Sequence, residues 1–366
     1  MRTVGVEEEL LLVDAETGVP RGVAAQAIAS ADASGAPDEG ALEHELQQQM
    51  IETDTAPTAD MSALAEELRS WRRTAIGAAR RAGVKVIASG TSLLPVEPRV
   101  VPHSRYQRMV EHFGLTTSEA LTCACHVHVS IDSHEEGVAV LDRIRAVTPL
   151  LIALSGNSPF WRGRDSGYAS YRSQAMLRWP TAGPQDVFGT ADAYDDLVQG
   201  MLRSGVMLDE GMVYFDARLS HRYPTVEIRV ADVCADVRDS VLIAALCRAM
   251  VETAARDWRS GGPPAAPATS LIRLAAWQAG RYGLSENLLD PVDMRPRPAR
   301  EVVDAFLGWI EPALQASGDH ETVVAGVERL FARGTGADRQ RAVFEKTGQL
   351  SDVVAYLARV TAEQEE

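Results

Sequence analysis

Three short apolar segments that carry ionisable residues in alternation place the strongest constraint on how this chain can fold. They read GVEEEL at 5–10, CHVHVS at 125–130 and TVEIRV at 225–230. The alternating pairs are Glu7 and Glu9, His126 and His128, and Glu227 and Arg229. Because successive side chains of a β-strand point to opposite faces, each segment predicts a strand with one polar face and one apolar face.

Three such polar faces need a common explanation, since burying an isolated polar group costs several kcal/mol. If the three strands are neighbours in one sheet, the shared face carries three glutamates, two histidines and one arginine. Hard divalent cations such as Mg²⁺ bind carboxylate oxygens and often complete their coordination with substrate phosphates. The pattern therefore predicts a cation site beside an arginine, although each pair alone could be a solvated strand face or a structural ion pair. Glu8 lies on the apolar side and needs a partner that the sequence does not identify.

A zinc site is the competing interpretation, because Cys123, Cys125, His126 and His128 fall within six positions. Alternation along the strand argues against it, since the two cysteines face one side and the two histidines the other. One ion could collect all four ligands only across a bulge. The sequence has no second CxxC or HxxxH motif to complete a structural site. The cysteines are expected to be small core residues.

Composition excludes several other classes of function. The net charge of −15 argues against sequence-independent binding to nucleic acid. Four cysteines do not suggest a disulfide framework, and no apolar run approaches the ~20 residues of a membrane helix. The start MRTVGVEEELLLV does not resemble a signal peptide, so a cytoplasmic protein without membrane association is expected. Lysine occurs only at Lys85 and Lys346 and no GxxxxGK[ST] loop is present, so arginine, metal ions or backbone amides must hold any phosphate.

The pattern along the chain predicts an α+β fold. Residues 1–260 are predicted to form the catalytic domain, residues 261–268 a linker, and residues 269–366 a C-terminal helical region packed on the same domain. Residues 14–40 are expected to be loop, and residues 157–225 an irregular segment over the site. The expected strands are 3–13, 45–55, 84–90, 120–132 and 225–233. The expected helices are 60–83, 104–113, 135–156, 240–258, 270–282, 299–316, 320–332 and 336–361.

Four motifs together resemble the carboxylate–amine ligases of the glutamate–cysteine ligase type 2 family, which are distant relatives of glutamine synthetase. They are VGVEEEL, CHVHVSID, LSGNSPFWRGRDSGYASYR and PTVEIRVAD, and the resemblance runs from about residue 3 to residue 260. It implies a glutamine-synthetase-like catalytic fold, in which a mainly antiparallel sheet flanked by helices forms a funnel. Such a funnel would hold ATP, an amino acid and two or three Mg²⁺ or Mn²⁺ ions.

The resemblance also implies roles for particular residues. The metal ligands would be Glu7, Glu9, Glu45, Glu52, His126 and Glu227, with Glu43 a weaker candidate. Arg229 would lie near the phosphates, and Arg172 and Arg218 would hold the transferring group or the substrate carboxylate. ATP or substrate contacts would come from His128, Asn157, Ser158 and Arg222. The chain reads RLS at 218–220 where many members read RPS, and Ala124 where they have glycine.

The implied activity is an ATP-dependent ligation of an amino-acid carboxylate, glutamate or a similar acid, to an amine through an acyl phosphate. Its partners would be these small molecules, and homo-oligomerisation is a family-level expectation. The departures leave open whether glutamate is the acid and which amine is used. The alternatives are a small-molecule phosphotransferase on the same fold, a zinc- or iron-dependent metalloenzyme without ATP chemistry, and a catalytically inactive relative that serves as a binding partner.

Overall fold

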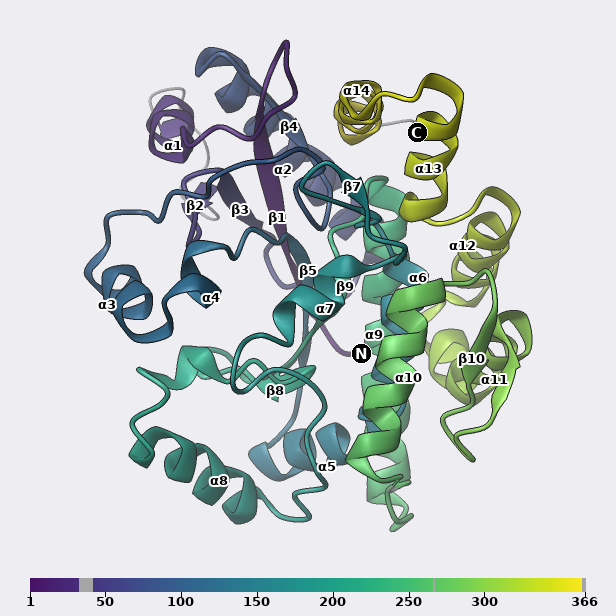
Figure 1. Ribbon diagram of the computed structural model, residues 1–366. Coiled ribbons are helices and arrows are strands. Elements are labelled where there is room, and N and C mark those ends of the chain that lie inside the picture. Colours follow the sequence, from purple (N-terminus) through teal and green to yellow (C-terminus); the bar gives the residue numbers. More distant parts are fainter. Residues whose placement is uncertain (33–41, 266, 364–366) are drawn as a thin grey trace.

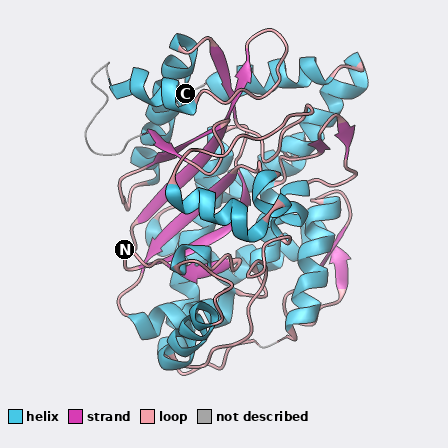
Figure 2. Cartoon of the chain, turned by 60° about the vertical axis from the view of Figure 1, so that its left-hand side comes forward, coloured by secondary structure: helices cyan, strands magenta, loops and turns pink. Residues whose placement is uncertain are grey.

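An antiparallel sheet lies at the centre of the molecule (Figure 1). The computed structural model describes residues 1–32, 42–265 and 267–363. Within these ranges the sheet has seven strands in the order β2-β3-β1-β5-β9-β8, and β4 pairs with the second half of β1. Figure 2 shows the strands crossing the centre with helices on both sides, which confirms the α+β class. The strands are β1 Val4–Asp14, β2 Leu42–His44, β3 Met50–Asp54, β4 Val84–Ile87, β5 Ala124–Ser130, β8 Ala217–Leu219 and β9 Thr225–Asp232.

The three segments with alternating polar residues form β1, β5 and β9, which are consecutive strands of this sheet. Val6, Val127 and Ile228, one apolar residue from each strand, are at most 1% exposed and belong to one core cluster. The predicted adjacency of the three strands is therefore confirmed. The alternating polar residues lie on the opposite face, whereas Glu8 lies on the apolar face and pairs with Arg72 of a helix that covers it.

Two long helices cover the apolar face of the sheet. Helix α2 (Met61–Arg81) begins after Asp60, whose carboxylate accepts hydrogen bonds from the backbone N–H groups of Ser62 and Ala63. This cap matches the predicted start of the helix. Helix α9 (Val237–Arg259) packs on α2 and β5, and most of its residues are buried. Apolar residues from both helices thus complete the core beneath β1 and β5.

Several predicted boundaries in the first half of the chain are wrong. The expected loop 14–40 contains helix α1 (Ala24–Asp32), while residues 33–41 lie outside the described ranges. The expected strand 45–55 is shorter, since only β3 (Met50–Asp54) forms within it, and the separate strand β2 (Leu42–His44) precedes the expected range. The expected helix 135–156 is broken into α5 (His134–Ile144) and α6 (Thr148–Ser155), because Pro149 in the first turn of α6 lacks the N–H that a continuous helix would need.

The segment 157–225 folds over the polar face of the sheet, as expected for an irregular region above a site. It nevertheless contains short regular elements. In Figure 1, α3 and α4, which precede β5, lie to the left of the sheet and α8 lies below it. The elements are α3 Ser104–Phe113, α4 Leu115–Ser118, β6 Phe160–Trp161, β7 Arg164–Asp165, α7 Tyr171–Met176, α8 Ala191–Arg203 and the 3₁₀ turn Glu210–Met212.

The C-terminal region is helical and packs against the elements that precede it. Helices α11 and α12 pack on α9, α10 packs on α6, and α14 packs on β4. The expected helix 336–361 is instead two helices, because Gly348 adopts a left-handed conformation with φ of 68° and ends the first of them. The elements are α10 Thr269–Tyr282, β10 Asn287–Leu289, β11 Pro296–Pro298, α11 Ala299–Ser317, α12 His320–Arg333, α13 Gly336–Thr347 and α14 Leu350–Ala362.

Among the described ranges, none of the helices combines the length and the apolar composition needed to cross a lipid bilayer.

Candidate active site

Glu7 joins the two histidines of β5 at the centre of the polar face. In the register of the sheet, Glu7 lies opposite His126 on β5, and His128 lies opposite Glu227 on β9. Glu7 Oε2 is 3.0 Å from His126 Nδ1, and Glu7 Oε1 is 2.9 Å from His128 Nε2. Burial would raise the pKa of Glu7, but hydrogen bonds from the two imidazoles outweigh it and lower that pKa well below its usual range.

Strand β3 brings further carboxylates to the other side of β1. Glu52 lies opposite Glu9, and Asp54 lies opposite Glu7. Glu45 follows β2 and lines the same cavity. Glu9 is fixed by the backbone N–H of Ala124, which donates to its Oε2 at 2.5 Å. The four predicted acids of the first two segments, Glu7, Glu9, Glu45 and Glu52, are thus brought together.

Three overlapping groups of these side chains have ligand atoms within 4.8 Å of one another. Each group contains at least one carboxylate, and Glu7 or Glu52 is shared between groups. This is the donor set that Mg²⁺ or Mn²⁺ accepts, namely carboxylate oxygen supplemented by imidazole. The groups are Glu7, His128 and Glu227; Glu7, Glu52 and His126; and Glu9, Glu45 and Glu52. We call these seven residues the acid–imidazole cluster.

Three carboxyls of the cluster, Glu9, Glu45 and Glu52, have raised pKa values, which means that their ionised forms lack sufficient positive charge nearby. Burial and the neighbouring Glu45 raise the pKa of Glu9 to about 8. Burial raises the pKa of Glu45, and burial with the other acids raises the pKa of Glu52 well above its usual range. A bound divalent cation would remove this penalty, because it stabilises the ionised form. The residues therefore fit a metal site; their individual roles as ligands stay a prediction.

Two predicted arginines lie at the opposite edge of the cluster and bind Glu227. Arg218 on β8 donates to Glu227 from Nε at 2.7 Å and from Nη2 at 3.1 Å, and Arg229 also forms an ion pair with Glu227. Burial would raise the pKa of Glu227, but Arg229 and then Arg218 lower it far below its usual range. Glu227 is therefore ionised and both guanidinium groups are held facing the cavity.

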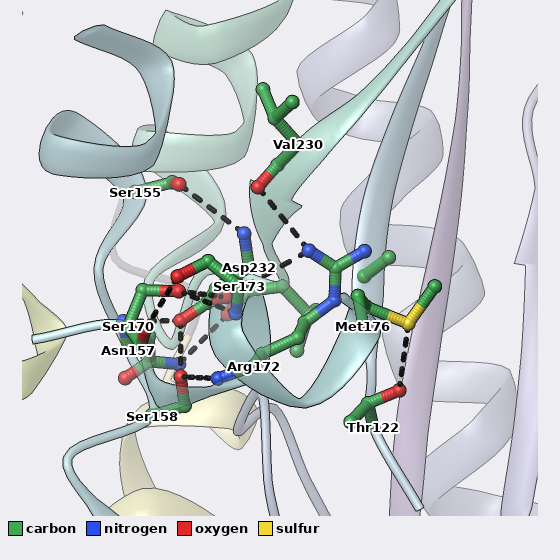
Figure 3. Close-up of polar contacts among 12 residues, drawn as sticks. Thr122, Ser155, Asn157, Ser158, Ser170, Arg172, Ser173, Met176, Val230 and Asp232 are labelled. Atoms are coloured by element: carbon green, nitrogen blue, oxygen red, sulfur yellow. Dashed lines mark hydrogen bonds and ion pairs between the residues drawn. The ribbon is translucent and has the colours of Figure 1, made fainter. Parts of the chain in front are cut away.

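Arg172, the third predicted arginine, is held by backbone carbonyls. It lies on α7, and its Nη1 and Nη2 donate to the carbonyl oxygens of Val230 and Arg229 at 3.2 and 3.0 Å. Figure 3 shows its guanidinium directed at β9, with a polar network behind it. Asp232 is at the centre of this network and accepts hydrogen bonds from the hydroxyls of Ser158 and Ser170 at 2.7 and 2.8 Å.

Asn157 and Ser158 belong to that buried network and do not line the cavity. Asn157 Nδ2 donates to the carbonyls of Ala88 and Val233, and its Oδ1 accepts from Nε2 of Gln340 on α13 at 2.7 Å. Ser158 Oγ accepts from the backbone N–H of Arg172 at 3.0 Å. The structure thus places both residues in the network behind Arg172, and their predicted contact with ATP or substrate stays a prediction.

The cavity above the cluster has a volume of about 740 Å³. It is lined by every member of the cluster and by Arg172, Arg218 and Arg229. Arg222 also lines it, from an exposed turn between β8 and β9. A cavity of this size, lined by both acids and arginines, can hold a nucleoside triphosphate together with a small substrate.

The cysteines do not take part in this cluster. Cys123 and Cys125 are fully buried, and neither lines the cavity that His126 and His128 line. All four cysteines are unpaired and buried, and burial raises each thiol pKa. The three metal-type groups contain histidine with carboxylates and no cysteine. The zinc interpretation of this segment is therefore not supported by the geometry.

Among the residues that line the cavity but were absent from the sequence prediction are Asp54, Arg105, Asp216 and Arg273. Asp54 had a signal, because it stands two positions after Glu52 and alternation puts both on one face. Arg105 is paired with Asp209 at 2.7 Å, across more than a hundred residues, and no local pattern indicates this. Asp216 and Arg273 come from the irregular segment and from α10, where the sequence has no periodic cue.

Comparison with known proteins agrees with this geometry. The profile described as "Glutamate-cysteine ligase family 2 (GCS2)" matches residues 3–356. A Streptomyces avermitilis protein named "Putative glutamate--cysteine ligase 2-1" is 53% identical over 361 residues, and one from Streptomyces coelicolor named "Putative glutamate--cysteine ligase 2" is 52% identical over 361 residues. In both cases 99% of each chain is covered.

A solved structure gives the same fold. The glutamate–cysteine ligase from Francisella tularensis in complex with AMP superposes with a TM-score of 0.71 at 13% identity, over 99% of this chain and 89% of that one. The predicted catalytic ligase fold is thereby confirmed. Family and fold together place the protein among the ATP-dependent carbon–nitrogen ligases of the carboxylate–amine type. The chain belongs to glutamate–cysteine ligase family 2.

Proposed function

We propose that this ligase joins glutamate, or a similar amino acid, to an amine in the cavity above β1, β3, β5 and β9. The observation that carries the proposal is the acid–imidazole cluster with Arg218 and Arg229 bound at its edge, all facing one cavity. The names of the relatives support glutamate as the acid. The amine is to be identified by experiment.

The chemistry requires activation of the carboxylate. An amine does not displace oxide from a carboxylate, whereas it readily displaces phosphate from an acyl phosphate. Transfer of the γ-phosphoryl group of ATP to the substrate carboxylate supplies that leaving group. Mg²⁺ or Mn²⁺ bound by the predicted ligands would neutralise the charge on the nucleotide phosphates. We assign this metal-binding role to Glu7, Glu9, Glu45, Glu52, His126 and Glu227.

The arginines of the chain hold and orient the anionic groups. Arg229 forms an ion pair with Glu227, and although burial would lower its pKa, the charges of the cluster glutamates raise it. Arg172 is nearly buried and its guanidinium is fixed by two carbonyls, so it presents a rigid charge to the cavity. Guanidinium groups bind phosphate and carboxylate through paired N–H donors. We assign Arg229, Arg172 and Arg218 to the transferring group and the substrate carboxylate, and Arg222 to the mouth of the cavity.

His128 and a cluster carboxylate are the candidates for the group that takes the proton from the attacking amine. The contact of the His128 imidazole with the Glu7 carboxylate, which accepts from it, outweighs burial and raises the pKa of His128, whereas burial and Arg229 lower the pKa of His126 to about 4. The surroundings therefore shift the pKa values of the two imidazoles of β5 in opposite directions. They keep His126 neutral, as a metal ligand requires, and favour the protonated form of His128.

The test is a coupled assay of ADP release in which amino acids are crossed with amines, with Mg²⁺, with Mn²⁺ and with EDTA. ADP release that needs both substrates and a metal ion, with the amide product seen by mass spectrometry, is the expected result. Release that needs one co-substrate and gives a phosphorylated product would instead identify a phosphotransferase. Turnover without nucleotide would identify a different metalloenzyme.

Two variants connect the activity to the site. Glu9→Gln and Arg229→Ala should each lower ADP release by at least about 100-fold, because each removes a charge at the phosphoryl-transfer centre. Glu66→Gln, an exposed change on α2, is the matched control. Wild-type turnover in Glu9→Gln or Arg229→Ala would remove that residue from the site.

We further expect the protein in the cytoplasm, where ATP is available and reducing conditions keep the four thiols free. Light scattering during size-exclusion chromatography tests the expected homo-oligomer.

A further inference from the structure

Asp216 presents an unpaired carboxylate to the part of the cavity next to the arginines. Its backbone N–H donates to the carbonyl of Gly183 at 3.1 Å, and its own carbonyl accepts from the N–H of Arg229 at 2.9 Å. The residue is thus fixed beside Arg229, immediately before β8. Its Oδ2 atom is buried and has no hydrogen-bond partner among the described residues. Buried polar atoms are rarely left in this state unless a water molecule or ligand completes them.

Within the part of the chain that the structure describes, no positively charged side chain forms a hydrogen bond or an ion pair with the Asp216 carboxylate. Arg273 and Arg172 act on it electrostatically, yet neither makes a hydrogen bond or an ion pair with it there. Burial raises the pKa of Asp216 to about 7, against the opposing influence of these two arginines. A positively charged group brought within hydrogen-bond distance would hold the carboxyl in its ionised form.

Arg273 supplies the opposite charge at the same part of the cavity. It lies on α10, is exposed, and lines the cavity together with Ala276 one turn later. A half-buried carboxylate, whose Oδ2 atom is fully buried, and an exposed guanidinium therefore line one cavity. This arrangement is complementary to a ligand that carries an ammonium and a carboxylate on neighbouring atoms, as an α-amino acid does.

We propose that Asp216 and Arg273 form the subsite for the α-amino-acid head group of a substrate. Asp216 Oδ2 accepts a hydrogen bond from the substrate ammonium, and the Arg273 guanidinium binds the substrate α-carboxylate. This inference rests on the proposed function, because it assumes that one substrate of the ligation is an amino acid. It goes beyond that function by naming the residues that select the amino acid over an acid or amine of similar size.

The discrimination expected from such a subsite is large. An analogue without the ammonium leaves the buried Oδ2 atom of Asp216 without a donor, and sites built around a hydrogen bond reject such analogues strongly. Glutarate, which is glutamate without its amino group, tests the Asp216 contact. 4-Aminobutyrate, which is glutamate without its α-carboxylate, tests the Arg273 contact. We expect each analogue to be used at least about 100-fold less well than L-glutamate.

The experiment compares Asp216→Asn and Arg273→Gln with the unsubstituted protein. The substrates are L-glutamate, the other common amino acids and the two analogues. Asp216→Asn should raise KM for the amino acid at least about tenfold and reduce the preference over glutarate, with KM for ATP changed less than about twofold. Arg273→Gln should reduce the preference over 4-aminobutyrate. Arg281→Gln is the control on the same helix, because Arg281 stacks on Tyr168 and Tyr282 and does not line the cavity.

A stability measurement separates this role from a structural one. Because Oδ2 makes no hydrogen bond within the described residues, Asp216→Asn should not lower the midpoint of urea unfolding. A lowered midpoint together with an unchanged preference over glutarate would show a structural residue and overturn the proposal. An unchanged KM and preference in Asp216→Asn would also overturn it.

A binding measurement distinguishes failure of the subsite from failure of the proposed function. Isothermal titration calorimetry with L-glutamate and the other amino acids is made with Mg²⁺ and a non-hydrolysable ATP analogue. Binding that is lost in Asp216→Asn supports the subsite even if no amine gives ADP release, in which case only the proposed ligation fails. Equal binding by both proteins, or binding of no amino acid by the unsubstituted protein, overturns the subsite whatever the ADP assay shows.

Discussion

Arg72 of α2 forms a two-point ion pair with Glu8 of β1 on the side of the sheet opposite to Glu7 and Glu9. Its Nη2 and Nε donate to the two carboxylate oxygens of Glu8 at 2.6 and 2.8 Å, and Ser240 Oγ on α9 donates to Glu8 Oε1 at 2.6 Å. The side chains are 1% and 0% exposed. The remaining donors of Arg72 bind the carbonyls of Cys234 and Ala235. This pair therefore ties β1 to both helices beneath it.

Breaking this pair should strongly destabilise the fold. Arg72→Met leaves the Glu8 carboxylate buried with only a hydroxyl as partner, and loss of one member of a buried pair costs about 3–5 kcal/mol. Urea unfolding followed by circular dichroism measures the change in free energy of unfolding. The control is Glu66→Gln, which removes the exposed Arg69–Glu66 pair of the same helix and should cost less than about 1 kcal/mol. If Arg72→Met and Glu66→Gln lowered the free energy of unfolding by similar amounts, burial of the Arg72–Glu8 pair would not explain its contribution to stability.

The stability of the metal-free protein should fall as the pH rises. The folded-state pKa of Glu9 is about 8 against an ordinary value of 4.5, so between these values the unfolded chain has released a proton that the folded chain retains. Folding takes up this proton, and stability is lost as the pH rises through that range. The raised pKa values of Glu45 and Glu52 act in the same direction.

Metal ions should reverse this trend. Mg²⁺ replaces the protons that the folded carboxyls retain. The increase in Tm on replacing EDTA by Mg²⁺ should therefore be larger near pH 8.5 than near pH 6. These two values lie on either side of the Glu9 pKa of about 8. Scanning fluorimetry at the two pH values measures the increase. Glu9→Gln should show a smaller dependence on pH. An equal Mg²⁺ effect at both pH values in the unsubstituted protein would argue against metal binding at these carboxyls.

Asn157→Asp should affect stability and leave ATP binding nearly unchanged. The amide Nδ2 donates to two backbone carbonyls. A carboxylate at this position has no proton to donate to them, so both hydrogen bonds would be lost and the free energy of unfolding should fall by at least about 2 kcal/mol. Urea unfolding and KM for ATP, measured at low temperature, are the two readouts. Asn287→Asp, at an exposed position of β10, is the matched control. A large rise in KM for ATP without loss of stability would restore Asn157 to the binding site.

The four cysteines should be inert in the folded protein. Each thiol is buried and has a raised pKa, so its reactive thiolate form is scarce. Titration with an aromatic disulfide reagent should detect no reactive thiol in the native protein and all four in denaturant. Rapid reaction of a native thiol would show that the local packing opens. The result also has a practical use, because a thiol-bearing amine could then be assayed without background from the enzyme.

The polar face of the sheet could be predicted from sequence because strand alternation is a local rule. It needed only that Glu7 and Glu9, the two histidines of β5, and Glu227 with Arg229 each stand two positions apart. The same rule applied to β3 would have added Asp54. The adjacency of the three strands was inferred from the free energy of burying polar groups, which is lower when the three polar faces share one site. The order of the strands in the sheet confirms this inference.

The remaining features depend on contacts between residues far apart in the chain. The partner of Glu8 lies 64 positions away on a helix, where Arg72 is one of many arginines. Asn157 stands in a motif typical of the family, yet its side chain turns away from the cavity to meet α13. Asp216 precedes a strand of three residues and has no periodic neighbours. Helix α1 has no strong cap or charge pattern, which explains why that stretch was predicted as loop.

The contact between Asn157 and Gln340 has a consequence for the order in which the protein becomes active during synthesis. The two residues are 183 positions apart, and Gln340 Nε2 bonds both the side-chain oxygen and the backbone carbonyl of Asn157. The segment that supports Arg172 therefore lacks this contact until α13 has been synthesised. A nascent chain that ends before α13 already contains every proposed metal ligand, and we expect it to be less active than the full chain because Asn157 is not yet held by Gln340.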